Sequence, residues 1–240
     1  MNEYELIKKL FGDTVPDLFA SDAQFFDAAG QRWGITCDAF SPDEDCFTLE
    51  SPRRLGANLV IATLSDLYAS GCEPSFFMHA ITFPHDAEES WMGELAAGIA
   101  SALKEAGCVL LGGDTGQGKS LSYTGIGLGP QRRPLTRRFP DARQRLYVSG
   151  KLGALNAAAY SGVPTPALTR RPTPPAATAC IDTSGGFMDA VWQLHELNPN
   201  HTIAIQDIPV DDISLLFGGA GEYELLFTAP YDEEETSGAF

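Results

Sequence analysis

The first half of the chain alternates between helix-like and strand-like patterns of apolar residues. Apolar side chains recur every three or four residues between Pro52 and Gly71, which predicts a helix that ends at the glycine. A similar pattern begins near Trp91 and predicts a second helix, with Asp86 as its N-cap. A shorter pattern predicts a helix over residues 3–11. We therefore expect two long helices and one short helix in this half.

Short apolar or alternating runs between these helices predict β-strands, because they are bounded by polar and glycine-rich residues. The first two runs flank an AAGQ turn and are expected to form a hairpin. We place the strands at residues 23–27, 31–38, 75–83, 108–111 and 121–129, with a glycine-rich turn at 112–119.

An arginine- and proline-rich stretch, residues 129–144, divides the chain. We place a domain boundary there, so that residues 1–130 form an N-terminal domain, residues 131–144 a linker and residues 145–240 a C-terminal domain. After the boundary we expect, in order, a strand, a helix, a strand, a helix and two strands, at residues 145–150, 151–162, 178–182, 185–197, 202–206 and 223–229. This order predicts a mixed α/β (α+β) fold with two domains.

Composition narrows the possible partners. The chain has 240 residues, 44% of them hydrophobic, and a net charge of −16, which indicates a globular protein and disfavours nucleic acid as a partner. No apolar run is long enough for a membrane span or a signal peptide, so we expect no membrane partner. The five cysteines include no CxxC pair, and a reducing, cytoplasmic location is the expectation.

One familiar motif is rejected on its context. Residues 113–120, GDTGQGKS, match the phosphate-loop pattern GxxxxGK[ST]. That motif works because its loop opens a helix whose amides hold the phosphates. The residues that follow, LSYTGIGLG, alternate like a strand. We therefore do not expect a conventional phosphate loop.

Aspartates in turn-like contexts are the strongest chemical signal in the chain. Carboxylates are hard oxygen ligands, and Mg²⁺ commonly bridges them to nucleotide phosphates. Several separated aspartates could therefore form a multi-metal phosphoryl-transfer site if the fold brings them together. Local alternatives exist, since Asp114 could cap a turn and Asp182 could cap the helix that follows it. The candidates are Asp22, Asp38, Asp66, Asp114 and Asp182.

Five motifs occur in an order that resembles one known family. They are SDLYASGCEP, LLGGDTGQG, YVSGKLG, ACIDTSGGF and GGAGEYELLFT. Together they resemble the thiamine-monophosphate kinase branch of the aminoimidazole-ribonucleotide synthetase-like superfamily. The resemblance implies an N-terminal domain that forms a homodimer through its sheet and a C-terminal α+β domain. It also implies that ATP and Mg²⁺ bind in the cleft between the two domains.

The resemblance also assigns roles to individual residues. A phosphate-binding arginine is implied at Arg137 or Arg138, and no residue stands out as a catalytic base. The implied metal-binding residues are Asp22, Thr36, Cys37, Asp38, Asp66, Asp114 and Asp182. The implied nucleotide-binding residues are Gly113, Asp114, Arg137 and Ser184, and those for a small phosphorylated substrate are Cys46 and Glu222.

The chain departs from the family pattern at several positions. Gly185 stands where the family has a metal-binding acid, Cys46 stands in place of a substrate-contacting histidine, and Ser21 replaces an acid. The chain also ends soon after GEYELLFT, so we expect a shortened C-terminal domain.

The expected function is therefore an ATP- and Mg²⁺-dependent kinase that converts thiamine phosphate to thiamine diphosphate. Two alternatives stay open. One is an ATP-dependent enzyme of the same superfamily with a different acceptor, and the other is a nucleotide-binding protein with little turnover.

Overall fold

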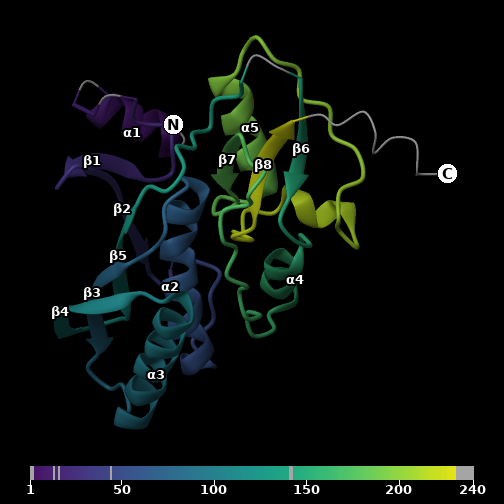
Figure 1. The fold of residues 1–240 in the computed structure, drawn as a ribbon. Coiled ribbons are helices and arrows are strands. Elements are labelled where there is room, and N and C mark those ends of the chain that lie inside the picture. Colours follow the sequence, from purple (N-terminus) through teal and green to yellow (C-terminus); the bar gives the residue numbers. More distant parts are fainter. Residues whose placement is uncertain (1–2, 13, 16, 44, 141–142, 231–240) are drawn as a thin grey trace.

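The structure is a computed structural model that describes residues 3–12, 14–15, 17–43, 45–140 and 143–230. It contains two β-sheets with helices between and around them (Figure 1). The mixed α/β class expected from the sequence is confirmed. No described helix is both long and apolar enough to cross a membrane.

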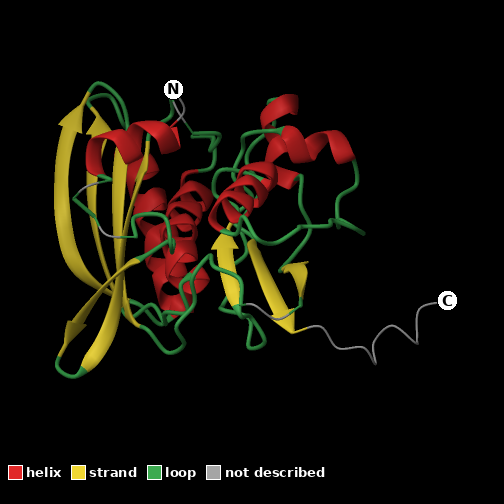
Figure 2. Ribbon diagram, turned by 90° about the horizontal axis from the view of Figure 1, so that it is seen from above, coloured by secondary structure: helices red, strands yellow, loops and turns green. Residues whose placement is uncertain are grey.

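The first sheet has five strands in the order β1-β2-β5-β3-β4. Neighbouring strands are antiparallel except β3 and β4, which run parallel. The strands span Gln24–Ala28 (β1), Gln31–Phe40 (β2), Phe76–Pro84 (β3), Val109–Gly118 (β4) and Ser122–Pro130 (β5). Helices α2 (Pro52–Ala69) and α3 (Glu89–Ala106) cover one face of this sheet, as Figure 2 shows, and α1 spans Glu3–Phe11.

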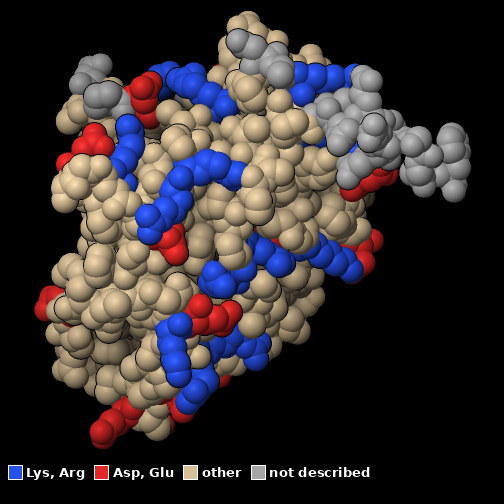
Figure 3. All heavy atoms as spheres, in the orientation of Figure 1, with Lys and Arg blue, Asp and Glu red and all other residues tan. Residues whose placement is uncertain are grey.

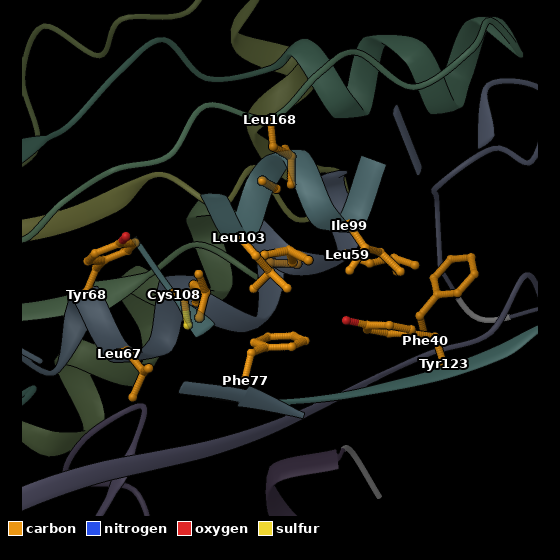
Figure 4. Packing of buried hydrophobic residues seen from close by; sticks show 14 of the residues in the cluster. Phe40, Leu59, Leu67, Tyr68, Phe77, Ile99, Leu103, Cys108, Tyr123 and Leu168 are labelled. Atoms are coloured by element: carbon orange, nitrogen blue, oxygen red, sulfur yellow. The ribbon is translucent and has the colours of Figure 1, made fainter. Parts of the chain in front are cut away.

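Helices α2 and α3 approach each other closely because glycines lie at their contact. A Cβ atom added at Gly56 would lie 2.2 Å from the carbonyl oxygen of Leu95, and one added at Gly98 would lie 1.9 Å from that of Arg53. The two backbones therefore touch where a larger residue would separate them. Around this contact, Leu59 and Ile99 pack with Phe77 from β3 (Figure 4).

The second sheet has three strands in the order β6-β8-β7 and is wholly antiparallel. Its strands are Gln144–Val148 (β6), Ala179–Asp182 (β7) and Leu225–Pro230 (β8). The helices of this part are α4 (Ala154–Ser161), α5 (Phe187–Leu197) and the short 3₁₀ helix η1 (Ile213–Phe217).

The two parts of the chain share one apolar core. Helix α2 contacts β7 of the second sheet as well as β2 and β5 of the first. Leu168, Cys180 and Leu225, from the second part, belong to the same buried cluster as Leu59 and Phe77, and Figure 4 shows Leu168 above the side chains of the first part. Helix α2 is therefore the element on which both parts are assembled.

Three local predictions are wrong. The N-cap residue of α3 is Glu88 rather than Asp86, and the Glu88 side chain makes no capping hydrogen bond. The expected turn at 112–119 belongs to strand β4, because its backbone pairs with β3 as far as Gly118. Residues 202–206 form no strand in the described sheets. The side chain of Ile203 packs against the second apolar cluster.

Candidate metal and nucleotide site

Three carboxylates from distant parts of the chain converge where the two sheets meet α2. Asp22 lies just before β1, Asp66 in the last turns of α2, and Asp182 at the end of β7. One carboxylate oxygen from each lies within 4.8 Å of the other two. Because α2 contacts both β2 and β7, its packing brings Asp66 to the point where the other two acids lie.

Hydroxyl groups fix the orientation of these carboxylates. Thr36 Oγ1, on β2, donates a hydrogen bond to Asp66. Ser65 Oγ donates to Asp182 Oδ2 at 2.5 Å, and Ser184 donates to Asp182 Oδ1 through its hydroxyl at 2.7 Å. Two of the residues expected from the sequence, Thr36 and Ser184, therefore lie at the cluster. Ser65 is an additional member: it opens the SDLYASGCEP motif, but no role was expected for it from the sequence.

Arg137 is the cation that enters the cluster. Its Nη2 lies 2.7 Å from Asp22 Oδ1 and its Nε lies 3.3 Å from Asp22 Oδ2, with the two side chains only 12% and 1% exposed. The neighbouring Arg138 is 56% exposed and pairs with Asp17 at 3.8 Å. Of the two arginines that the sequence left open, only Arg137 lies beside the carboxylates.

The cluster carries more negative charge than Arg137 neutralises. Burial raises the pKa of the Asp66 carboxyl well above its ordinary value, and the nearby Asp182 and Asp22 raise it further. Burial also raises the pKa of Asp22, although Arg137 opposes this effect. Carboxylates this close are stabilised by a divalent cation, and three carboxylates with adjacent hydroxyls are hard oxygen donors that suit Mg²⁺.

Asp38 lies near the cluster without joining its three closest members. It occupies the same face of β2 as Thr36, because alternate residues of a strand share a face. Burial raises the pKa of Asp38 to about 7, and the charge of Asp182 contributes. Cys37, between them, is exposed on the opposite face of the sheet, so its thiol points away from Asp66.

The glycine-rich segment lies elsewhere. Gly113 and Asp114 are exposed on β4, an edge strand, and Asp114 pairs in register with Ala80. Asp114 therefore shares the face of the sheet that α2 and α3 do not cover, and it is not part of the described three-carboxylate group. Strand β5 follows this segment directly, so no helix is available for a phosphate loop.

Neither of the two expected substrate residues belongs to the described three-carboxylate group. Glu222 is buried and accepts hydrogen bonds from the backbone amides of Leu155 and Asn156 at 3.2 and 3.4 Å, and from Asn156 Nδ2 at 3.0 Å. It therefore stabilises the first turn of α4. Cys46 is exposed, and its carbonyl oxygen accepts a hydrogen bond from Thr165 Oγ1 at 3.1 Å.

A further acid lies beside the glycine that interrupts the motif after β7. A Cβ atom at Gly185 would lie 2.5 Å from Asp189 Oδ2. Gln193 Nε2 donates to the same Asp189 oxygen at 2.6 Å, and Gln193 Oε1 accepts from Arg137 at 2.6 Å. Gln193 thus connects Asp189 to the carboxylate cluster. The sequence feature that could have identified Asp189 is its spacing: it follows Gly185 by about one helical turn.

Comparison with known proteins gives a consistent family. The family described as AIR synthase related protein, N-terminal domain, matches residues 20–129. The thiamine-monophosphate kinase of Pyrococcus horikoshii is 24% identical, over 96% of this chain and 83% of that protein. That of Archaeoglobus fulgidus is 23% identical, over 98% of this chain and 88% of its own.

Solved structures share the fold. The crystal structure of tt0281 from Thermus thermophilus has a TM-score of 0.78 at 26% identity and covers 98% of this chain and 87% of that one. The structure described as AaThiL complexed with AMPPCP and TMP has a TM-score of 0.80 at 18% identity, covering 95% and 85%. A HypE–HypF complex has a TM-score of 0.72 at 18% identity, covering 97% and 86%.

Proposed function

The chain belongs to the AIR synthase-related proteins, in their thiamine-monophosphate kinase-like branch, and we propose that it is an ATP- and Mg²⁺-dependent phosphotransferase. The observation that carries this proposal is the convergence of Asp22, Asp66 and Asp182 beside a buried arginine. The relatives in sequence are kinases, and one structure of the same fold is a complex with AMPPCP and TMP. The acceptor that these likenesses favour is thiamine phosphate.

The side chains divide the work of such a site. Asp22, Asp66 and Asp182 would hold Mg²⁺, which would neutralise charge on the transferring phosphoryl group. Arg137 would leave Asp22 once that carboxylate binds metal, and its guanidinium would then be free to hold a phosphate oxygen. Phosphoryl transfer needs positioning and charge neutralisation more than proton transfer, so the lack of an obvious base is compatible with this chemistry.

We also propose that the protein works as a homodimer formed through the first sheet. The face opposite α2 and α3 keeps large apolar side chains exposed: Phe26 is 42%, Met78 40% and Val109 55% exposed. An apolar sheet face of this kind favours a partner surface. Asp114 lies on the same face, and a second copy packed there would receive its carboxylate at the interface.

The acceptor is the least constrained part of the proposal. Glu222, the expected substrate-binding acid, is engaged with the first turn of α4. This observation favours, as the second candidate, an ATP-dependent enzyme of the same family that acts on a different acceptor. The HypE-like neighbours show that the fold extends beyond thiamine-phosphate kinases.

The deciding experiment is turnover with ATP, Mg²⁺ and thiamine phosphate, with thiamine diphosphate measured as the product. The proposal expects product formation that Asp66→Asn abolishes and that Asp27→Asn, an exposed acid of β1, leaves unchanged. Binding of ATP with Mg²⁺ but no thiamine diphosphate would favour the second candidate. Failure to bind ATP with Mg²⁺ would contradict both.

A further inference from the structure

A second cleft, distinct from the carboxylate cluster, lies beside the C-terminal end of α2. It has a volume of about 360 Å³ and is bounded by that helix end, the segment after β5 and the proline-rich loop before β7. None of Asp22, Asp66 and Asp182 lines it. The cleft is therefore a separate site.

The charge of this cleft is opposite to that of the whole protein. Three arginines line it, Arg132, Arg133 and Arg170, against a single acid, Glu73. The whole chain has 32 acidic and only 16 basic residues, so three arginines in one cleft are a marked concentration of positive charge. Figure 3 shows that, over the face seen there, Lys and Arg side chains are interspersed with Asp and Glu.

The backbone around the cleft holds these arginines in place. The amides of Arg132 and Arg133 both donate to the carbonyl oxygen of Gly71, at 3.0 and 3.2 Å. Thr173 Oγ1 donates to the Tyr68 carbonyl oxygen at 2.5 Å, and Gln131 Nε2 donates to that of Ser70 at 3.0 Å. These bonds occupy carbonyl groups at the end of α2, whose partial negative charge would otherwise repel an anion.

The guanidinium of Arg133 already donates to the carbonyl oxygens of Pro174 and Pro175. Anion binding would therefore fall to Arg132 and Arg170. Arg170 Nη1 donates to the Tyr68 hydroxyl at 3.3 Å, but Arg170 Nε is buried without a hydrogen-bond partner among the described residues. Arg132 Nε is paired with Glu73 at 2.8 Å on the exposed side of the cleft, where both side chains are more than 60% exposed. A charged group with an unpaired buried donor is costly, and an anion beside the Arg170 guanidinium would stabilise its charge.

We propose that this arginine cleft binds the phosphate group of a small phosphorylated molecule without a divalent cation. Arginine presents a planar set of donors that matches phosphate oxygens, and it carries its charge at any physiological pH. The volume exceeds that of a lone phosphate and lies at the lower end of the range for small-molecule sites. Pro74, Pro172 and Pro175 provide apolar walls for the remainder of the ligand.

The test is calorimetric titration with AMP in EDTA, where the carboxylate cluster has no metal with which to hold a phosphate. We expect AMP to bind, inorganic phosphate to compete with it, and adenosine not to bind. Arg170→Gln and Arg132→Glu should each weaken AMP binding by about tenfold or more, because each removes a charged donor. Asp66→Asn should leave AMP binding in EDTA unchanged, which separates this site from the proposed catalytic one.

Arg53→Glu is the matched control. Arg53 is 62% exposed and paired with Glu94 at 2.6 Å, as Arg132 is 62% exposed and paired with Glu73, but it lies outside the cleft. If inorganic phosphate binds as tightly as AMP, the anion site is supported and its ligand is the free phosphate anion. No AMP binding, equal binding of adenosine, or AMP binding that neither Arg170→Gln nor Arg132→Glu weakens would overturn the proposal.

Discussion

The carboxylate cluster and the glycine-rich strand β4 carry the same kind of residue in different surroundings. Asp66 lies inside the molecule, oriented by Thr36 and grouped with two other acids. Asp114 is exposed on an edge strand, on the opposite face of the same sheet from Thr36. In the sequence, each aspartate follows a small residue, Ser65 or Gly113, within a motif of the family pattern. In the fold, only Asp66 shares its site with other carboxylates of the same chain.

The difference follows from which element packs against each aspartate. Helix α2 lies between two sheets, so a side chain near its C-terminal end meets residues from both parts of the chain. Strand β4 has β3 on one side and, in the sheet order, no further strand on the other. Asp114 is not part of the described three-carboxylate group, and a second copy packed on its face of the sheet would supply it with partners. The comparison predicts that Asp66 acts within one chain, whereas Asp114 acts only in an assembly.

The largest effect is expected for Asp66→Asn. It removes a carboxylate from the metal cluster, so the affinity for ATP with Mg²⁺ should fall at least about a hundredfold, equivalent to about 2.7 kcal/mol. The metal-free variant should melt at the same temperature as the unaltered protein or higher, because a buried charge with a raised pKa has been removed. Calorimetry and a melting curve measure the two quantities.

Lys119→Ala provides the contrast for that experiment. Lys119 is exposed and follows the glycine-rich strand, so its loss should change the affinity for ATP with Mg²⁺ much less than Asp66→Asn does. The reverse ranking would restore the phosphate-loop interpretation of residues 113–120 and contradict the carboxylate site.

The sequence predicted most elements of the first sheet because their patterns are local. The helix that ends before Gly71 follows from apolar spacing, and α3 ends at Gly107 with φ of 68°, as a C-terminal glycine predicts. The start of strand β4 was predicted, but its extension through the glycine-rich segment was missed, because that length depends on pairing with β3, which no local pattern of GGDTGQG reveals. In the same way, Ser65 and Asp189 reach the site through packing between distant segments.

The second prediction concerns the assembly. Met78→Lys places a charge on the exposed apolar face of the first sheet, where a partner copy would have to bury it. We expect this variant to be a monomer by light scattering at micromolar concentration. Any activity that depends on Asp114 from the second copy should be lost with the dimer. Ile213→Lys is the control, since Ile213 is 67% exposed but lies on η1 in the second part. A monomeric unaltered protein would contradict the proposed dimer.

The third prediction is a pH dependence of the metal-free protein. The pKa of Asp38 rises from 3.8 to about 7 on folding, so between these values the folded state holds a proton that the unfolded state has released. Stability must therefore fall as the pH rises through this window, with each pKa unit of difference worth about 1.4 kcal/mol. The raised pKa values of Asp22 and Asp66 act in the same direction.

Melting curves in EDTA across this window measure the effect. The melting temperature should decrease towards neutral pH, and Asp38→Asn should reduce the slope. Added Mg²⁺ should raise the melting temperature most at the high-pH end, where the carboxylates are ionised. A melting temperature that is flat or rises with pH in EDTA would show that the carboxylates are not held in their protonated form.

The smallest effect is expected at Asp189, which tests how the site tolerates Gly185. Because Asp189 Oδ2 lies 2.5 Å from where a Cβ on residue 185 would be, Asp189 already places a carboxylate beside that position. We expect Asp189→Asn to weaken binding of ATP with Mg²⁺ by up to about fivefold, as for an exposed charge, and Gly185→Asp to restore it in that variant. Gly185→Asp alone should give no gain in turnover, since two adjacent carboxylates repel each other. A large gain from Gly185→Asp alone would instead show that the acid missing at position 185 has no substitute and that its absence limits catalysis.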